Sequence, residues 1–148
     1  MPEKATLERA KRDQAAGKAP STQAGEFVRE EMDHIREGKH GARSTKQAIA
    51  IGLSKARRSG VALPPPKTGK RKTRESAARA YRQGRSARSQ RPSARRSRAV
   101  KAALRHEGRR AASPAALARQ ARSSARKRTA AERRSAARKA ARTRAKNR

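Results

Sequence analysis

One stretch decides how this chain folds, and it reads STKQAIAIGLSKAR, from Ser44 to Arg57. Its apolar side chains recur at positions 48, 49, 52, 53 and 56, which is the spacing of one helix face. Ser44 and Gln47 have the spacing of a capping box, in which the serine side chain accepts a hydrogen bond from the amide three residues on. Cations fill the last turn and Gly60 follows, as expected where a helix ends in a left-handed residue. The stretch therefore predicts a capped amphipathic helix.

A second helix is predicted directly before it, over residues 26–37. Val28, Met32 and Ile35 stand at i, i+4 and i+7, and glycines at positions 38 and 41 then end the helix. The two helices would form a hairpin that is marginally stable alone, because chains below about 40 residues rarely bury enough apolar surface to offset the entropy of ordering. Gly52 either permits close approach of the helices or only weakens the second one, and the sequence leaves both readings open.

Charge divides the chain in two. Residues 1–60 hold 13 Lys and Arg against 8 Asp and Glu, whereas residues 61–148 hold 30 against 3. Three consecutive prolines at positions 64–66 lie near the boundary and favour an extended spacer. We distinguish four segments: a polar leader over 1–25 with a short helix around 6–16, the helical hairpin over 26–60, a Pro/Lys-rich linker over 61–72, and a basic tail over 73–148 rich in Arg, Lys, Ala and Ser.

The basic tail is expected to be largely disordered when free. The net charge of the chain is +32 and its hydrophobic share of 32% includes many alanines, so little apolar surface is available to offset chain entropy. Alanine and arginine favour helix once the charge is neutralised, and the best candidate helix begins at Ser113-Pro114 and runs to about Ala145. Three residues are expected to break the region before it: Gly84, Pro92 and Gly108. The predicted fold class is mainly α, a short helical hairpin plus a long basic, largely disordered or conditionally helical C-terminal tail.

The density of cations predicts a polyanion as partner. The arginine fork donates two hydrogen bonds to a phosphate and keeps its charge, and the tail holds too few acids to neutralise it. We expect non-sequence-specific nucleic-acid binding, to DNA more than to RNA, through backbone phosphates. The cations expected to make these contacts are Lys70, Arg71, Lys72, Arg95, Arg96, Arg109, Arg110, Arg119, Arg122, Arg126, Lys127, Arg128, Arg133, Arg134, Arg138, Lys139 and Arg142. Two alternatives stay open: an RNA- or ribosome-associated basic protein, and a protein-interaction module at 26–60 that the tail localises.

Catalysis, a cofactor and a membrane partner are not expected. The sequence has no glycine-rich phosphate loop, no nucleophile motif, no cysteine and no apolar run of membrane length. Glu30 and His34 stand at i, i+4, a spacing that suits a metal, but no third ligand is evident nearby, so an exposed helix surface is the favoured interpretation and no metal is expected. Tyr81 is the only aromatic residue of the basic half, which disfavours stacking of single-stranded bases. The expected location is cytoplasmic and nucleoid-associated.

Both predicted helices resemble a small bacterial family of uncharacterised function, DUF6496. The resemblance covers residues 26–60 and lies in the runs FVREEM (27–32), HIREGK (34–39) and, most specifically, KQAIAIGLSKAR (46–57). It implies a bacterial source and no catalytic or ligand-binding residue. The tail is similar in composition to bacterial histone H1-like proteins, which implies a nucleoid-associated role.

Overall fold

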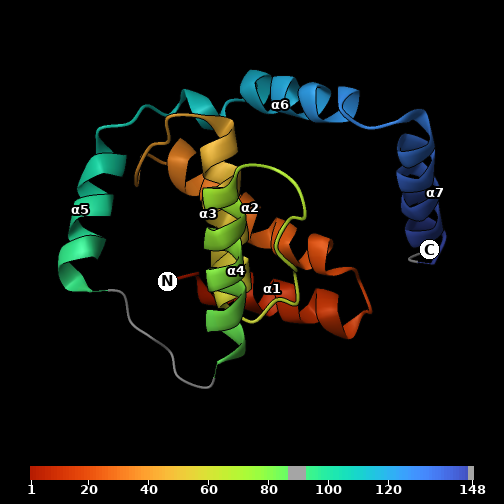
Figure 1. Cartoon of the computed structure of the whole chain (residues 1–148), viewed down its shortest axis with the longest axis horizontal. Helices are drawn as coiled ribbons and strands as arrows, with labels where there is room; N and C mark the ends of the chain where they lie inside the picture. The colour runs from red at the N-terminus through yellow and green to blue at the C-terminus, as the bar shows by residue number, and fades with distance from the viewer. Residues whose placement is uncertain (87–92, 147–148) are drawn as a thin grey trace. The chain divides into compact units, whose positions relative to one another are not determined.

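The computed structural model describes residues 1–86 and 93–146, and all regular secondary structure in these residues is helical (Figure 1). The elements are α1 (Lys4–Ala15), α2 (Pro20–Arg36), α3 (Thr45–Arg58), α4 (Arg71–Arg85), α5 (Ala94–Arg105), the short 3-10 helix η1 (Arg110–Ala112), α6 (Pro114–Arg126) and α7 (Ala130–Lys146). The chain forms two compact units, Met1–Ser113 and Pro114–Arg148.

This architecture corrects the predicted fold class. The long disordered or conditionally helical tail is wrong, because the helices α4 to α7 occupy most of the basic region that the structure describes. The isolated hairpin is wrong as well, since α1 packs on α2 and α4 packs on α3, so that the hairpin is the centre of a larger helical unit (Figure 1). The prediction failed because it judged the tail by its lack of large apolar side chains, whereas α4 contributes small ones to the interior.

Helices α2 and α3 supply the centre of the first unit. Phe27 and Ile35 of α2 are fully buried, and so are Ala48 and Ala56 of the predicted stripe of α3. The N-terminus of α3 is capped as predicted, because the Ser44 hydroxyl accepts from the Gln47 amide at 3.2 Å. The glutamine departs from the predicted capping box, since its side-chain oxygen accepts from the amide of Arg43 at 2.9 Å.

Glycines set how closely these helices approach. A Cβ at Gly52 would collide with the backbone of Val28 and the carbonyl of Phe27, so this glycine permits the contact of α2 with α3. Gly84 was expected to break a helix, but it lies inside α4, where a Cβ would collide with the Arg57 carbonyl. Gly60 has a φ of +90° and follows α3 as the predicted left-handed residue.

The segments on either side of the hairpin complete its core. Ala10 of α1, Ala24 and Phe27 of α2, Ala56 of α3 and Val61 form one buried cluster. Leu63, in the predicted linker, packs against this cluster. The Arg57 guanidinium fixes the same linker by donating to the carbonyls of Leu63 at 3.1 Å and Pro64 at 3.3 Å. Burial of this guanidinium lowers the pKa of Arg57 from its ordinary value.

Residues 104–112 return to the turn between α2 and α3. Backbone hydrogen bonds join Gly41 to Leu104 at 2.8 Å and Ala42 to Gly108 at 3.1 Å. The Thr45 hydroxyl donates to the carbonyl of Ala111 at 2.7 Å, inside the protein. Alanines 111 and 112 are buried there, so a part of the predicted tail is integral to the first unit.

The second unit begins as predicted but does not continue as one helix. Helix α6 starts at Pro114, ends at Arg126 and is followed by a separate α7, so the single helix to about residue 145 is wrong. The break coincides with a capping box in which the Glu132 amide donates to the Thr129 hydroxyl at 3.2 Å and the Thr129 amide donates to the Glu132 carboxylate at 2.8 Å. The sequence contains this signal as T-x-x-E. Gly108 separates α5 from η1 as expected, and Pro92 lies outside the described residues.

Candidate functional site

Every cation predicted to contact nucleic acid is exposed. Lys70, Arg71 and Lys72 stand at the start of α4, Arg95 and Arg96 in the first turn of α5. Arg109 and Arg110 lie at η1, and the remaining ones lie on α6, on α7 or between them. The structure thus distributes these side chains over five helical elements, and four of them line one hollow at α6: Arg119, Arg122, Arg126 and Lys127.

Few of the exposed cations that the structure describes in the basic region have acidic neighbours. Among the described residues that follow α3, one ion pair is present, between Arg71 and Glu75 at 2.7 Å. The first three helices differ, since Arg9 pairs with Glu26 at 2.6 Å and Lys18 pairs with Asp13 at 2.7 Å. The charge of the basic region is therefore available to an external anion.

One face of α6 concentrates this charge. Three of its arginines and one serine, together with the lysine that follows the helix, line a shallow hollow: Arg119, Arg122, Ser123, Arg126 and Lys127. These positions follow i, i+3, i+4, i+7 and i+8, so their side chains are neighbours on the helix surface. We call these five residues the α6 cationic face. The sequence contains this spacing, but the prediction of one long helix did not distinguish these residues as a separate face.

Helix α7 presents its cations differently. At about 100° per residue, its predicted contact residues spread over more than half of the helix circumference: Arg133, Arg134, Arg138, Lys139 and Arg142. All of them are exposed. This helix can therefore meet anions on more than one side, as a helix surrounded by phosphates would.

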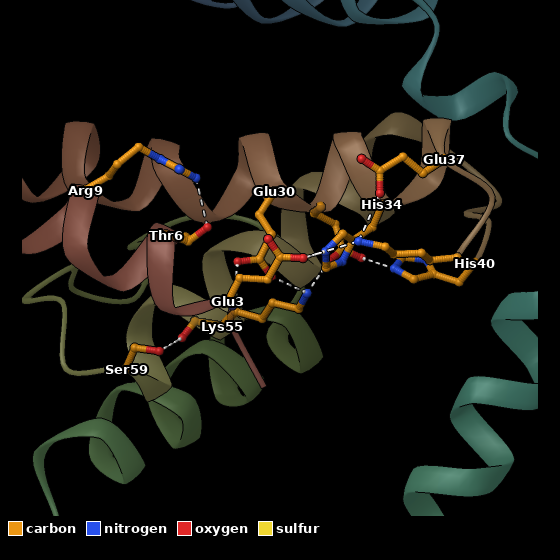
Figure 2. Close-up of polar contacts among 11 residues, drawn as sticks. Glu3, Thr6, Arg9, Glu30, His34, Glu37, His40, Lys55 and Ser59 are labelled. Carbon is orange, nitrogen blue, oxygen red and sulfur yellow. Dashed lines mark hydrogen bonds and ion pairs between the residues drawn. The ribbon is translucent and has the colours of Figure 1, made fainter.

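In contrast to the unpaired cations of α6 and α7, paired acidic and basic side chains form a network on the first unit, where α1 and α2 meet (Figure 2). Burial would raise the pKa of Glu30, but hydrogen bonds from the Glu3 amide at 3.1 Å, from Thr6 and from Lys55 at 3.2 Å outweigh it, so that the pKa of Glu30 is lowered. Hydrogen bonds from His34 at 2.8 Å and Lys39 at 3.2 Å lower the pKa of Glu3 as well. The network ties the N-terminus of the chain to α2.

Glu31 lies at the buried end of this network. Its side chain is fully buried, with Oε2 at 2.7 Å from the Lys55 ammonium and Oε1 at 3.3 Å from His40 Nε2. The rings of His34 and His40 stand edge to face, with their centroids 6.1 Å apart. Sequence reasoning paired Glu30 with His34 and missed Glu31 and His40. The i, i+3 spacing of Glu31 and His34 was available, but the return of His40 depends on the turn at Gly38, whose φ is +78°.

Comparison with known proteins finds a likeness to a family in part of the first unit. Residues 11–68 match the model of DUF6496, a family of unknown function, which confirms the resemblance and extends it into α1 and the proline run. No curated protein and no solved structure matches the chain. The compositional likeness of the tail to histone H1-like proteins is not confirmed by these comparisons. In the described part of the chain, no helix combines the length and apolarity needed to cross a bilayer.

Proposed function

We propose that this protein binds nucleic acid, duplex DNA above all, without sequence preference and through backbone phosphates, with the α6 cationic face as the principal contact. The observation that supports this most is the hollow lined by Arg119, Arg122, Arg126 and Lys127. Like charges at i, i+3 and i+4 repel each other by about 0.2–0.5 kcal/mol per pair. In a helix that no acid neutralises, a bound phosphate relieves this repulsion and accepts the paired hydrogen bonds of the guanidinium.

The shape of the basic helices favours DNA over RNA. The major groove of B-DNA, about 12 Å wide, admits an α-helix, whereas the corresponding groove of an A-form RNA duplex is too deep and narrow to be read by side chains. The spread of cations around α7 suits a helix that lies between two phosphate backbones. Tyr81 is the one aromatic residue of the basic half, and the Arg85 guanidinium, 5.6 Å from the centre of its ring, competes for one face, so stacking of unpaired bases is disfavoured. These features support a DNA-binding, nucleoid-associated role in the cytoplasm.

A salt titration tests the mechanism. Each phosphate contact on duplex DNA contributes about −0.9 to the slope of log K against log salt, so engaging a third of the 30 cations that follow Gly60 gives a slope of about −9. Different duplex sequences should bind within about 1–2 kcal/mol of each other, which is less than one mismatch costs many specific readers. A slope shallower than about −3 would contradict phosphate contact as the mechanism. Tighter binding to duplex RNA than to duplex DNA would indicate that RNA is the nucleic-acid partner.

Two matched variants locate the contact. The first replaces the α6 cations, as R119Q/R122Q/R126Q/K127Q, and the second replaces four exposed cations of the first unit, as R29Q/R43Q/K46Q/R58Q. Both lose four positive charges, so a uniform electrostatic effect would act on them equally. We expect the α6 variant to make the salt slope shallower by about 3–4 and the control to change it by less than about 1. Equal changes in the two variants would contradict the α6 cationic face as the principal contact.

A further inference from the structure

We propose that Glu31, His34 and His40 form a binding site for a single transition-metal ion, with Zn²⁺ as the preferred ion. The three residues each direct one ligand atom into a common space, with all of these atoms within 4.8 Å of one another. Figure 2 shows His34 and His40 converging where Glu3 and Lys55 also approach. This site is independent of the basic helices and departs from the expectation that the chain holds no metal.

The hydrogen bonds of His40 fix which of its nitrogens faces the site. Its Nδ1 lies 3.1 Å from the carbonyl oxygen of Gly41, which can only accept, so Nδ1 carries the proton. In the neutral imidazole, Nε2 then has a lone pair, and it faces Glu31 Oε1 at 3.3 Å. In this neutral form two acceptors face each other inside the protein, and a cation between them, a proton or a metal ion, would satisfy both. A histidine that donates its other N–H to a backbone carbonyl is also the usual form of a metal-bound histidine.

Glu31 supplies the second, independent indication. It is fully buried, and neither of its carboxylate oxygens has a hydrogen-bond partner among the described residues. The Lys55 ammonium at 2.7 Å from Oε2 forms an ion pair without the angles of a hydrogen bond. A buried carboxylate without hydrogen bonds is costly, and a metal bond to Oε1 would remove that cost.

The distances agree with a zinc ion. Zinc binds imidazole nitrogen and carboxylate oxygen at about 2.0–2.2 Å, so two ligand atoms on one tetrahedral ion lie about 3.3–3.5 Å apart. The 3.3 Å between His40 Nε2 and Glu31 Oε1 falls at this value. The His34 ring completes the set, because its ligand atom lies within 4.8 Å of the others. Two histidines and one glutamate leave the fourth position of the ion open to water.

The surroundings select the class of metal. Lys55 and the high net charge of the chain disfavour weakly held cations, and Mg²⁺ and Ca²⁺ need several oxygen ligands, which this site lacks. Imidazole ligands instead favour zinc and its neighbours. Glu3 acts as a positioning residue, since its carboxylate lies 2.8 Å from His34 Nε2 and holds that ring. The site would fasten the turn after α2 to the helix itself.

Zinc binding by the untagged full-length protein, in competition with a chromogenic chelator, tests the site. We expect one ion per chain, and we expect H40Q and H34Q each to weaken binding by more than the roughly 10–100-fold that loss of a supporting residue costs. E3Q should weaken it within that range, and H106Q, which changes the one histidine outside the cluster, should leave it unchanged. Unchanged affinity in H40Q, or equal losses in H40Q and H106Q, would overturn the proposal.

Two further measurements keep the test decisive if a variant is damaged. Circular dichroism identifies any variant that has lost its helices. In place of such a variant, the unaltered protein is titrated with zinc, and NMR follows the signals of its histidine rings. Zinc should shift the signals of His34 and His40 and leave those of His106 in place. Cobalt(II) in place of zinc should show the intense visible absorption of a four-coordinate ion. Absence of any zinc-dependent shift, or an equal shift of all three histidines, would overturn the site.

Discussion

The helices α1–α4 and the helices α6–α7 are stabilised by different means. The first group buries large side chains and forms ion pairs between helices, with Phe27 and Ile35 withdrawn from solvent and Arg9 joined to Glu26. In the second group, no residue that the structure describes is buried. Its helices begin at local signals instead, at Ser113-Pro114 and at the capping box of Thr129 with Glu132.

This difference explains how one chain holds both a packed unit and an exposed one. Interior packing needs few charges and close contact between helices, whereas phosphate binding needs cations that remain in solvent. The chain separates the two requirements along its length, and α4 belongs to both, because Ala77 and Ala80 face α3 while Arg71 and Lys72 face solvent. A change in the core of the first unit should therefore leave α6 and α7 unaltered, and a change in a helix cap of the second unit should leave the core unaltered.

The largest effect is expected from removing the central aromatic residue. Phe27→Ala should lower the free energy of unfolding of the first unit by about 3–5 kcal/mol, because it leaves a cavity among Ala24, Ala56 and Val61. Urea unfolding followed by circular dichroism, together with amide exchange in α3, measures this loss. The control Val100→Ala alters a side chain that is 53% exposed and should change stability by less than about 0.5 kcal/mol. Similar losses in the two variants would remove the distinction between packed and exposed positions.

The next effect comes from the glycines at the helix contacts. Gly52→Ala and Gly84→Ala should each destabilise the first unit by about 1–3 kcal/mol, since the added methyl group meets the backbone of a neighbouring helix. Gly25→Ala is the matched control, because a Cβ there meets nothing within 4 Å, and it should stabilise α2 by about 0.5–1 kcal/mol. Thermal unfolding of the three variants gives the comparison. A stabilising Gly84→Ala would show that α4 does not approach α3 as described.

A smaller and strictly local effect is expected in the second unit. Thr129→Ala removes the hydroxyl that accepts from the Glu132 amide, and it should destabilise α7 by about 1 kcal/mol while leaving the first unit unchanged. Backbone chemical shifts of residues 130–134, compared with those of α3, report both outcomes. Thr143→Ala changes a threonine inside the same helix and serves as the control. A change in the chemical shifts of α3 would indicate that the two units depend on each other.

The smallest effect is a pH dependence at the same position. Hydrogen bonds from the amide and hydroxyl of Thr129 lower the pKa of Glu132. Its carboxylate therefore stabilises the first turn of α7 at pH values above the ordinary glutamate pKa of about 4.3, and this contribution is lost as the pH falls through the lowered value. NMR shifts of residues 130–134 between neutral and acid pH should follow this loss. Glu132→Gln should show no such transition.

The sequence predicted those parts of the fold that neighbouring residues control. The start of α3 at Ser44, the left-handed Gly60 and the start of α6 at Pro114 all depend on groups within about four positions of each other. The apolar stripe of α2 was likewise legible, and Phe27, Met32 and Ile35 are buried. The exposure of the predicted contact cations follows from their charge, because an unpaired charge is rarely buried.

The sequence by itself determined the apolar faces of α2 and α3 and where the positive charge is concentrated, since both depend on residue type and spacing alone. Tertiary structure alone decided the role of Gly84 in α4, the burial of Ala111 and Ala112, and the meeting of His40 with Glu31. Each of these depends on groups that lie far apart in the chain and on close contact between backbones. Small side chains permit such contact, but they leave no pattern in the sequence that predicts it. An alanine or glycine contributes little apolar surface, so a residue assigned to the tail from the sequence can still be part of the core in the structure.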